Sequence, residues 1–115
     1  MKRYAVISVG TNSCRFLIAA RIDDAWRVEY HESRGTRLGE GVDASRRLDE
    51  GAMARTLDAA RDYAKLSAGV DRLSAIGTSA LRDAANTQEF LDRFREATGV
   101  ALVILSGDEE ARCSF

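Results

Sequence analysis

The order of the apolar segments predicts an α/β domain with a mixed five-stranded sheet and helices on its faces. Three apolar segments joined by short polar turns come first, and helical segments then alternate with strands up to the last residue. The chain has 115 residues, of which 45% are hydrophobic and 30% are charged. This size and composition are typical of one folded domain.

The first part of the sequence predicts three consecutive strands. Residues 4–9 and 14–20 are nearly continuous apolar runs on either side of a small polar turn at residues 10–13, which is the pattern of a β-hairpin. The first run has no polar face, so we expect its strand at the centre of the sheet. Residues 26–33 alternate loosely, which predicts a third strand with one solvent-exposed face.

Two helical segments and a strand follow. Residues 48–66 carry apolar side chains at helical spacing, with Asp49 as the expected N-cap. Residues 73–77 predict a short strand, and residues 79–85 a short helix or helical turn.

The last part of the sequence predicts a further helix, strand and helix. Residues 86–89 have the pattern of a capping box, and Gly99 suits the C-terminal end of the helix that they begin. Residues 100–105 predict an apolar strand. A second capping-box pattern then begins a helix over residues 106–115.

Charge, apolar runs and cysteines exclude several classes of protein. Lys and Arg number 17 and Asp and Glu 18, so the net charge of −1 argues against DNA as a partner. No apolar run approaches the roughly 18 residues that a membrane span needs, so we expect no membrane partner. Two distant cysteines and one histidine form no zinc or disulfide pattern, which predicts a cytoplasmic protein.

The turn Gly10-Thr11-Asn12-Ser13 is the first candidate site. Glycine allows a phosphate to approach the backbone, and the three polar residues offer amide and side-chain donors. Gly and Asn are also common in hairpin turns. Spacing alone therefore leaves two interpretations, a plain hairpin connection or an anion-binding turn.

A second candidate lies where the strand at residues 73–77 meets the helical segment after it. Thr78 and Ser79 are hydroxyl residues at a helix start, where an anion can bind. Arg82 lies one turn later, and its guanidinium suits a phosphate clamp. A helix cap beside a solvent-exposed arginine explains the same residues equally well.

Acidic residues at the last predicted helix and a glycine-rich segment are weaker candidates. Asp108, Glu109 and Glu110 suit a helix N-terminus for dipole reasons alone. Capping gives Glu109 a structural role, which leaves Glu110 as the acid most available for chemistry. Residues 37–41 form either a further site or a plain loop.

Three residues of chemically versatile types are assigned structural roles. We expect Cys14 to be a small buried hydrophobic residue, because no base is identifiable beside it. Trp26 is expected in the core and His31 on the surface of a strand.

Four segments together resemble the N-terminal part of the exopolyphosphatase and guanosine pentaphosphate phosphohydrolase (Ppx/GppA) family. They read AVISVGTNSCR from residue 5, RLGEG from residue 37, TSALRDAAN from residue 78 and SGDEEAR from residue 106. They follow the order and spacing of the family and span essentially the whole chain. The resemblance implies a ribonuclease-H-like domain of the actin-like ATPase and sugar kinase superfamily, in agreement with the predicted element order.

The resemblance also implies a reaction and the residues that perform it. Gly10, Thr11, Asn12 and Ser13 would contact phosphate, Arg82 would hold a phosphate, and Glu110 would position or deprotonate the attacking water. The expected reaction is hydrolysis of a phosphoanhydride bond in polyphosphate or guanosine pentaphosphate, usually with Mg²⁺.

Two features depart from the family pattern. Ser8 stands where the family usually has an aspartate that helps to hold Mg²⁺, so we expect weaker Mg²⁺ binding. The chain also ends before the second phosphate loop and second domain of the family. Residues 1–115 are therefore expected to be an N-terminal domain that presents half of a cleft, is catalytically silent alone, and self-associates, for example as a homodimer.

Two other functions remain open at this point. One is a kinase-type phosphotransferase domain of the same superfamily. The other is a non-catalytic phosphate-binding or interaction module, which the absence of the carboxylate at Ser8 favours.

Overall fold

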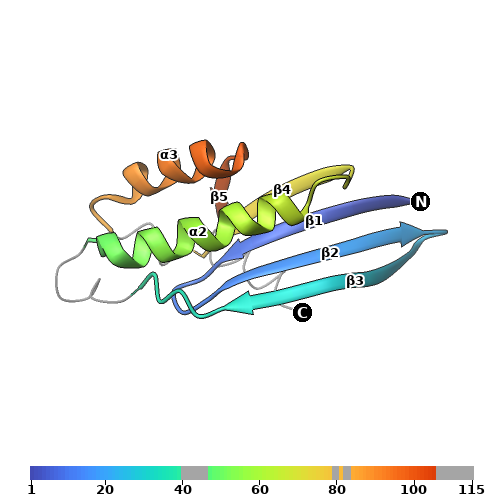
Figure 1. The fold of residues 1–115 in the computed structure, drawn as a ribbon, viewed down its shortest axis with the longest axis horizontal. Helices are drawn as coiled ribbons and strands as arrows, with labels where there is room; N and C mark the ends of the chain where they lie inside the picture. The colour runs from blue at the N-terminus through green and yellow to red at the C-terminus, as the bar shows by residue number, and fades with distance from the viewer. Residues whose placement is uncertain (40–46, 79–80, 82–83, 106–115) are drawn as a thin grey trace.

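Strands and helices follow one another along the chain in the predicted order (Figure 1). The computed structural model describes residues 1–39, 47–78, 81 and 84–105. The elements are β1 (Lys2–Val9), β2 (Cys14–Ile22), β3 (Ala25–Arg34), α2 (Glu50–Leu66), β4 (Arg72–Gly77), α3 (Thr87–Thr98) and β5 (Leu102–Ile104). The prediction of an α/β fold is confirmed.

The strands form one mixed sheet in the order β3-β2-β1-β4-β5. β1 pairs antiparallel with β2 and parallel with β4. The outer pairs repeat this division, since β2 and β3 are antiparallel and β4 and β5 are parallel. β1 therefore lies at the centre of the sheet, as its continuous apolar run predicts.

Helices α2 and α3 cover one face of this sheet (Figure 1). Because side chains alternate along a strand, Ala5, Ile7 and Val9 of β1 point toward the helices together with Cys14 and Phe16 of β2. All five are almost completely buried. The largest contributions of the helices to the same core are Met53, Leu57, Tyr63, Phe90 and Phe94.

The opposite face of the sheet, called the open face below, has no helix packed on it within the described residues. Trp26 and Val103 on this face are 58% and 56% exposed. The prediction that Trp26 lies in the core is therefore wrong. Trp26 lies on edge strand β3, where its ring contacts Tyr4 with 5.4 Å between centroids and packs beneath no described helix.

The ends of the helices confirm two sequence predictions and correct one. Asp49 caps α2 by accepting a hydrogen bond from the Ala52 amide at 3.0 Å, and Gly99 ends α3 with φ at 77°. Helix α3 begins directly after Asn86, as predicted, but the capping box at residues 86–89 is wrong, because the Asn86 side chain makes no cap bond. Its side-chain amide instead accepts from the amide of Leu48 at 2.7 Å and donates to the carbonyl of Leu48 at 3.1 Å.

Two strands differ from the sequence prediction. β3 is largely exposed on both faces, rather than on one, because it is an edge strand that the helices do not cover along its length. β5 is shorter than the predicted strand over residues 100–105. The predicted helix over residues 79–85 lies mostly outside the described residues, and the one over residues 106–115 lies wholly outside them. Among the helices that the structure describes, none is long and apolar enough to cross a membrane.

Candidate functional site

The turn of Gly10, Thr11, Asn12 and Ser13 joins β1 to β2 at the carboxyl end of β1. The parallel strand β4 ends at the same edge, where the amide of Thr78 donates to the carbonyl of Val9 at 3.2 Å. In open α/β sheets this edge is where ligands usually bind. The fold therefore brings together the first candidate site and the start of the second.

Within the turn, backbone carbonyls and backbone amides differ in whether they have a hydrogen-bond partner. The carbonyls of Thr11, Asn12 and Ser13 are occupied: the Gly39 amide donates to the Thr11 oxygen at 2.9 Å, the Arg37 amide to the Asn12 oxygen at 3.1 Å, and the Gly10 amide to the Ser13 oxygen at 2.9 Å. The amides of Thr11, Asn12 and Ser13 have no acceptor within the described part of the chain. Occupied carbonyls and unused amides are the arrangement that an anion requires.

Gly10 keeps the turn closed. A Cβ at this position would lie 3.2 Å from the Ser13 carbonyl oxygen and 4.0 Å from Cγ2 of Thr78. The first distance is tighter than an ordinary van der Waals contact, so a side chain at Gly10 would push apart the two strands that the turn connects.

Residues 36–39 brace the turn from behind. Leu38 is fully buried, and Arg37 holds a positive φ of 51° that orients its amide toward Asn12. At Gly39 a Cβ would lie only 3.0 Å from Cβ of Thr11, so glycine is needed for this close approach. Residues 37–41 were open to two interpretations, a site or a loop, and residues 37–39 hold the turn in place.

Two buried hydroxyls beside the turn have no hydrogen-bond partner in the described part of the chain: Oγ1 of Thr36 and Oγ1 of Thr78. An unpaired buried polar group costs about 1–3 kcal/mol. A ligand or water that accepts from Thr78 would remove this cost. Thr78 belongs to the second candidate site predicted from the sequence, whereas nothing in the sequence distinguishes Thr36 from an ordinary loop residue.

The second candidate site is only partly described. Leu81 is buried, its amide donates to the Thr78 carbonyl at 3.2 Å, and its Cδ1 lies 3.1 Å from where a Cβ on Gly77 would be. Leu81 therefore packs against the end of β4. Ser79, Arg82 and the acidic group that ends at Glu110 lie outside the described residues, so their roles stay predictions.

The corner at Ser8 does not fit a magnesium ion. Ser8 is half-buried at the carboxyl end of β1, on the open face, and its partner across the β1-β2 pair is Arg15. A neutral hydroxyl beside a guanidinium is a poor environment for a hard dication, which prefers carboxylates and carbonyl oxygens. Among the residues that the structure describes, no group of three or more His, Cys, Asp or Glu is placed to hold a metal.

Cys14 leaves the turn as a buried residue, as predicted. Burial raises the pKa of its thiol to about 12, which makes it a poor nucleophile. The hydroxyl of Tyr63 on α2 donates to the Cys14 carbonyl at 3.3 Å, and the Tyr63 ring stacks on Phe16 at 4.9 Å between centroids. Burial also raises the pKa of Tyr63 to about 12. These contacts anchor the start of β2, and with it the turn, to α2.

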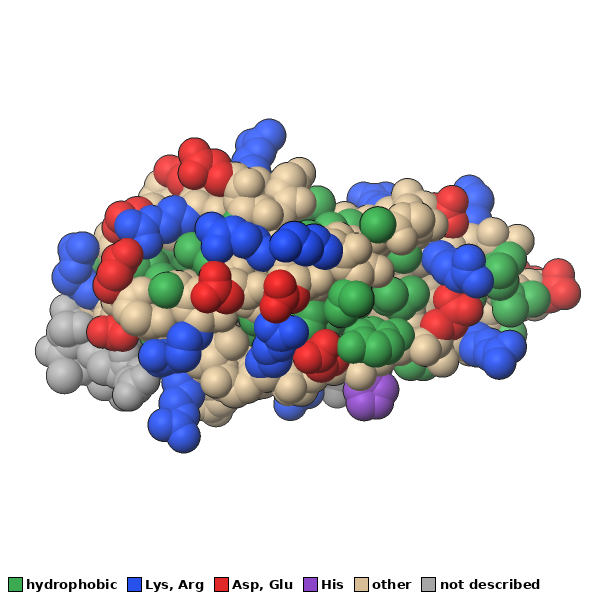
Figure 2. All heavy atoms as spheres, viewed as in Figure 1, with side chains coloured by type: hydrophobic (Ala, Val, Ile, Leu, Met, Phe, Trp, Pro, Cys, Tyr) green, Lys and Arg blue, Asp and Glu red, His purple; other side chains and the backbone are tan. Residues whose placement is uncertain are grey.

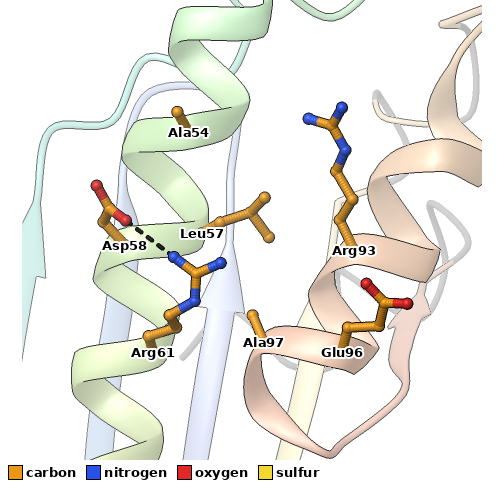
Figure 3. Close-up of a pocket in the computed structure, with 7 residues that line it drawn as sticks. All are labelled: Ala54, Leu57, Asp58, Arg61, Arg93, Glu96 and Ala97. Carbon is orange, nitrogen blue, oxygen red and sulfur yellow. Dashed lines mark hydrogen bonds and ion pairs between the residues drawn. The ribbon is translucent and has the colours of Figure 1, made fainter.

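Apart from the turn, a hollow of about 470 Å³ lies between α2 and α3 (Figure 3). Arg61 pairs with Asp58 at 3.1 Å, and Arg93 pairs with Glu50 at 2.7 Å. Figure 2 shows side chains of both signs spread over these helices. Because its arginines are already paired with carboxylates, this hollow is a weaker anion site than the turn.

The family model described as the Ppx/GppA phosphatase family matches residues 18–115 of the chain. Exopolyphosphatase 2 of Mycobacterium tuberculosis is 40% identical over 126 residues, which cover 100% of this chain and 40% of the relative. A guanosine-5'-triphosphate,3'-diphosphate pyrophosphatase of Aeromonas hydrophila is 33% identical over 97% of this chain and 23% of its own length.

Solved structures agree with these matches. A crystal structure of the Aquifex aeolicus member of the Ppx/GppA family superposes with a TM-score of 0.93 at 32% identity, over 96% of this chain and 37% of the other. An exopolyphosphatase from Cytophaga hutchinsonii gives a TM-score of 0.90 at 29% identity, over 96% of this chain and 36% of the other. The chain thus spans about 40% or less of the length of these proteins.

Proposed function

The chain belongs to the Ppx/GppA phosphatase family, and on this basis we propose that it forms the phosphate-binding half of a phosphoanhydride hydrolase. The substrate is inorganic polyphosphate or guanosine pentaphosphate, and the products are inorganic phosphate and the shortened substrate. The observation that carries the proposal is made on three residues of the turn, Thr11, Asn12 and Ser13, whose carbonyls are occupied and whose amides are available.

The turn binds the phosphate that is transferred to water. The amides of Thr11, Asn12 and Ser13 donate to its oxygens, and the unpaired hydroxyl of Thr78 adds a donor at the same edge. These donors are fixed in place before the substrate arrives, so they stabilise the charge on the transferred group without reorganising during the reaction. The fixed position of the braced turn is what makes this stabilisation effective.

Two residues outside the described ranges complete the mechanism. Arg82 holds a phosphate oxygen with its guanidinium, and Glu110 accepts a proton from the attacking water. The water oxygen then bonds to the terminal phosphorus as the bridging P–O bond breaks, and the electron pair leaves with the shortened chain. Support for both roles comes from the match of residues 78–86 and 106–112 to the family pattern.

The remainder of the cleft comes from a second domain of the complete protein, because relatives in the family are far longer than this chain. Half of a cleft does not hold water and phosphate in line, so residues 1–115 alone do not turn over substrate. Phosphatases of this family generally depend on a metal. The corner at Ser8 supplies no carboxylate for it, so any Mg²⁺ is bound mainly by the phosphates of the substrate. We place the protein in the cytoplasm, in keeping with its cysteine pattern.

A pair of glycine substitutions tests the proposal in the complete protein that contains this chain. Gly10→Ala places a methyl group 3.2 Å from the Ser13 oxygen, whereas Gly35→Ala, the matched control, meets nothing within 4 Å. We expect Gly10→Ala to lower phosphate release from polyphosphate or guanosine pentaphosphate at least tenfold and Gly35→Ala to leave it unchanged. Equal rates in both variants would contradict the role of the turn.

The same assay separates the two alternative functions. A non-catalytic phosphate-binding module, which Ser8 favours, would bind polyphosphate through the same turn and release no phosphate. A kinase-type domain would transfer phosphate only when an acceptor is added. Release of phosphate to water without an acceptor supports hydrolysis.

A further inference from the structure

Strand β3 is the long edge of the sheet (Figure 1). It has 10 residues, whereas β5 at the other edge has 3. Alternate backbone groups of an edge strand point away from its single neighbour. Within the described residues, no backbone hydrogen bond joins β3 to a segment other than β2. The edge of β3 therefore offers a row of amides and carbonyls to a further strand.

Large apolar side chains are exposed along the same strand. Trp26 and Val28 are each 58% exposed, and Tyr30 is 42% exposed. One exposed apolar residue is ordinary on a protein surface. Three of them on one edge strand, beside unpaired backbone groups, favour association with another strand.

A β-bulge near the middle of β3 determines which face each of its residues occupies. The pairing register shifts between Ile18 and Ala19 of β2, which leaves Glu29 as the extra residue on β3. Glu29 turns to the helix-covered face, where its Oε1 accepts from Nε of Arg3 at 2.7 Å. The open face carries Trp26, Val28, His31 and Ser33, and the helix-covered face carries Arg27, Tyr30, Glu32 and Arg34. Even-numbered residues thus point to the open face before the bulge, and odd-numbered residues do so after it.

This pattern suits antiparallel pairing of β3 with the β3 of a second copy, about a two-fold axis between positions 29 and 30. The opposed residues would be Trp26 and Ser33, Arg27 and Glu32, Val28 and His31, and Glu29 and Tyr30. Both members of every pair lie on the same face, as the pairing of strands requires. Without the bulge the same pairs would point to opposite faces, because side chains alternate along a regular strand.

The charges along β3 favour this register. Arg27 has no ion-pair partner among the described residues, and it would oppose Glu32 at two symmetric positions. Glu32 accepts from Arg34 and Tyr30 of its own chain, and a carboxylate has room for a third donor. A shift of the second copy by two residues would instead put Arg27 opposite Arg34 and Glu29 opposite Glu32. Like charges that face each other directly destabilise a strand pair.

We propose that two copies of this protein associate through their β3 edges, which pair antiparallel into one continuous sheet. Backbone hydrogen bonds provide the attraction, and the pairs of Arg27 with Glu32 fix the register. Trp26 and Val28 lose contact with water when the second strand lies beside them. The proposal is independent of the proposed function, since it concerns a surface outside the turn at residues 10–13.

Sedimentation equilibrium of the complete protein that contains this chain, over a concentration series, tests the association. The unchanged protein should be a dimer that dissociates on dilution. Arg27→Glu puts a carboxylate opposite Glu32 at both symmetric positions, and should raise the dimer dissociation constant about tenfold or more. Arg72→Glu is the matched control, because Arg72 is an exposed arginine on β4, away from this edge. It should leave the dissociation constant unchanged.

Oxidative cross-linking tests the register, with Cys113→Ser in every variant. Val28→Cys together with His31→Cys places two thiols opposite each other across the strand pair, with Cα atoms about 4.5–5.5 Å apart, which a disulfide spans. Within one chain these positions are roughly 8–10 Å apart, which is too far for a disulfide. Val28→Cys with Ser33→Cys is the control, because these positions are not opposite each other. The first variant should form a cross-linked dimer and the control should not.

Four results would overturn the proposal when circular dichroism shows each variant to be folded. They are an unchanged protein that stays monomeric throughout the series, equal dissociation constants for the unchanged protein and Arg27→Glu, equal losses for Arg27→Glu and Arg72→Glu, and equal cross-linking of the two cysteine variants. None of them bears on the role of the turn, which phosphate release tests separately.

Discussion

The two faces of the sheet are built from alternate residues of the same strands, yet their surroundings differ completely. Ile7 and Val9 on the helix-covered face are fully buried, whereas Leu17 and Val103 on the open face are substantially exposed. Both faces are rich in apolar residues. The comparison teaches that the apolar pattern alone does not determine which face packs, because the helices and their connections make that choice. The covered face holds the fold together, and the open face carries the pair of Ser8 and Arg15 beside the turn.

The largest expected effect comes from removing an aromatic ring on the covered side. Phe94→Ala removes a fully buried ring of α3 and should lower the free energy of unfolding by about 3–5 kcal/mol. Trp26→Ala removes a larger ring from the open face, where it is 58% exposed, and should cost about 1 kcal/mol or less. Urea unfolding followed by circular dichroism measures both, and a cost for Trp26→Ala equal to that of Phe94→Ala would break the comparison.

A smaller effect sharpens the comparison by removing one tyrosine hydroxyl from helix α2, above the covered face, and one from the open face. Tyr63→Phe deletes the buried hydroxyl that donates to the Cys14 carbonyl, and should cost about 1 kcal/mol because that carbonyl is left unpaired. Tyr4→Phe deletes a hydroxyl on the open face that has no partner among the described residues, and should change the stability little. Unfolding midpoints of the two variants are the readout, and the reverse ranking would contradict the role assigned to Tyr63.

The smallest expected effect concerns a charge pair at the rim of the covered face. Arg34 donates to Asp62 at 2.7 Å, and this hydrogen bond holds the pKa of Asp62 below its usual value. A lowered carboxyl pKa stabilises the fold above the unfolded-state pKa, and that stabilisation is lost as the pH falls through the folded-state pKa. Both side chains are partly exposed, so the effect is small.

Melting temperatures of the unchanged chain and of Arg34→Met, measured from pH 7 to pH 3, test this pair. The difference between the two melting temperatures should become smaller as the pH falls. A gap that stays constant across that range would mean that Arg34 stabilises the fold through packing over the Tyr63 ring, where its guanidinium carbon lies 5.2 Å from the centroid, rather than through Asp62.

Local patterns in the sequence predict the parts of this molecule that depend on local physics. The central position of β1 follows from its apolar run, the start of α2 from Asp49, and the end of α3 from Gly99. In the site, the turn at residues 10–13 was identified from residue types alone, and its hairpin geometry is confirmed.

Long-range contacts account for what the sequence did not predict. Asn86 reads locally as a cap, but its amide pairs with both backbone groups of Leu48, 38 residues away. The local sequence around Arg37 and Gly39 predicts only a loop. Their support of the turn depends on hydrogen bonds to Asn12 and Thr11, which are distant in the sequence. The roles of Arg82 and Glu110 are predictions from the family pattern, and both residues lie outside the described ones.

The buried sulfur of Cys14 allows local opening at the start of β2 to be measured. A thiol reagent reaches this side chain, with its pKa raised to about 12, only when β2 locally separates from α2, so the labelling rate reports how often that opening occurs. A ligand that binds only the closed turn slows labelling in proportion to its occupancy. Mass spectrometry of the peptide that contains Cys14 therefore gives both the opening frequency and the affinity for an anion, without any reporter group added to the chain.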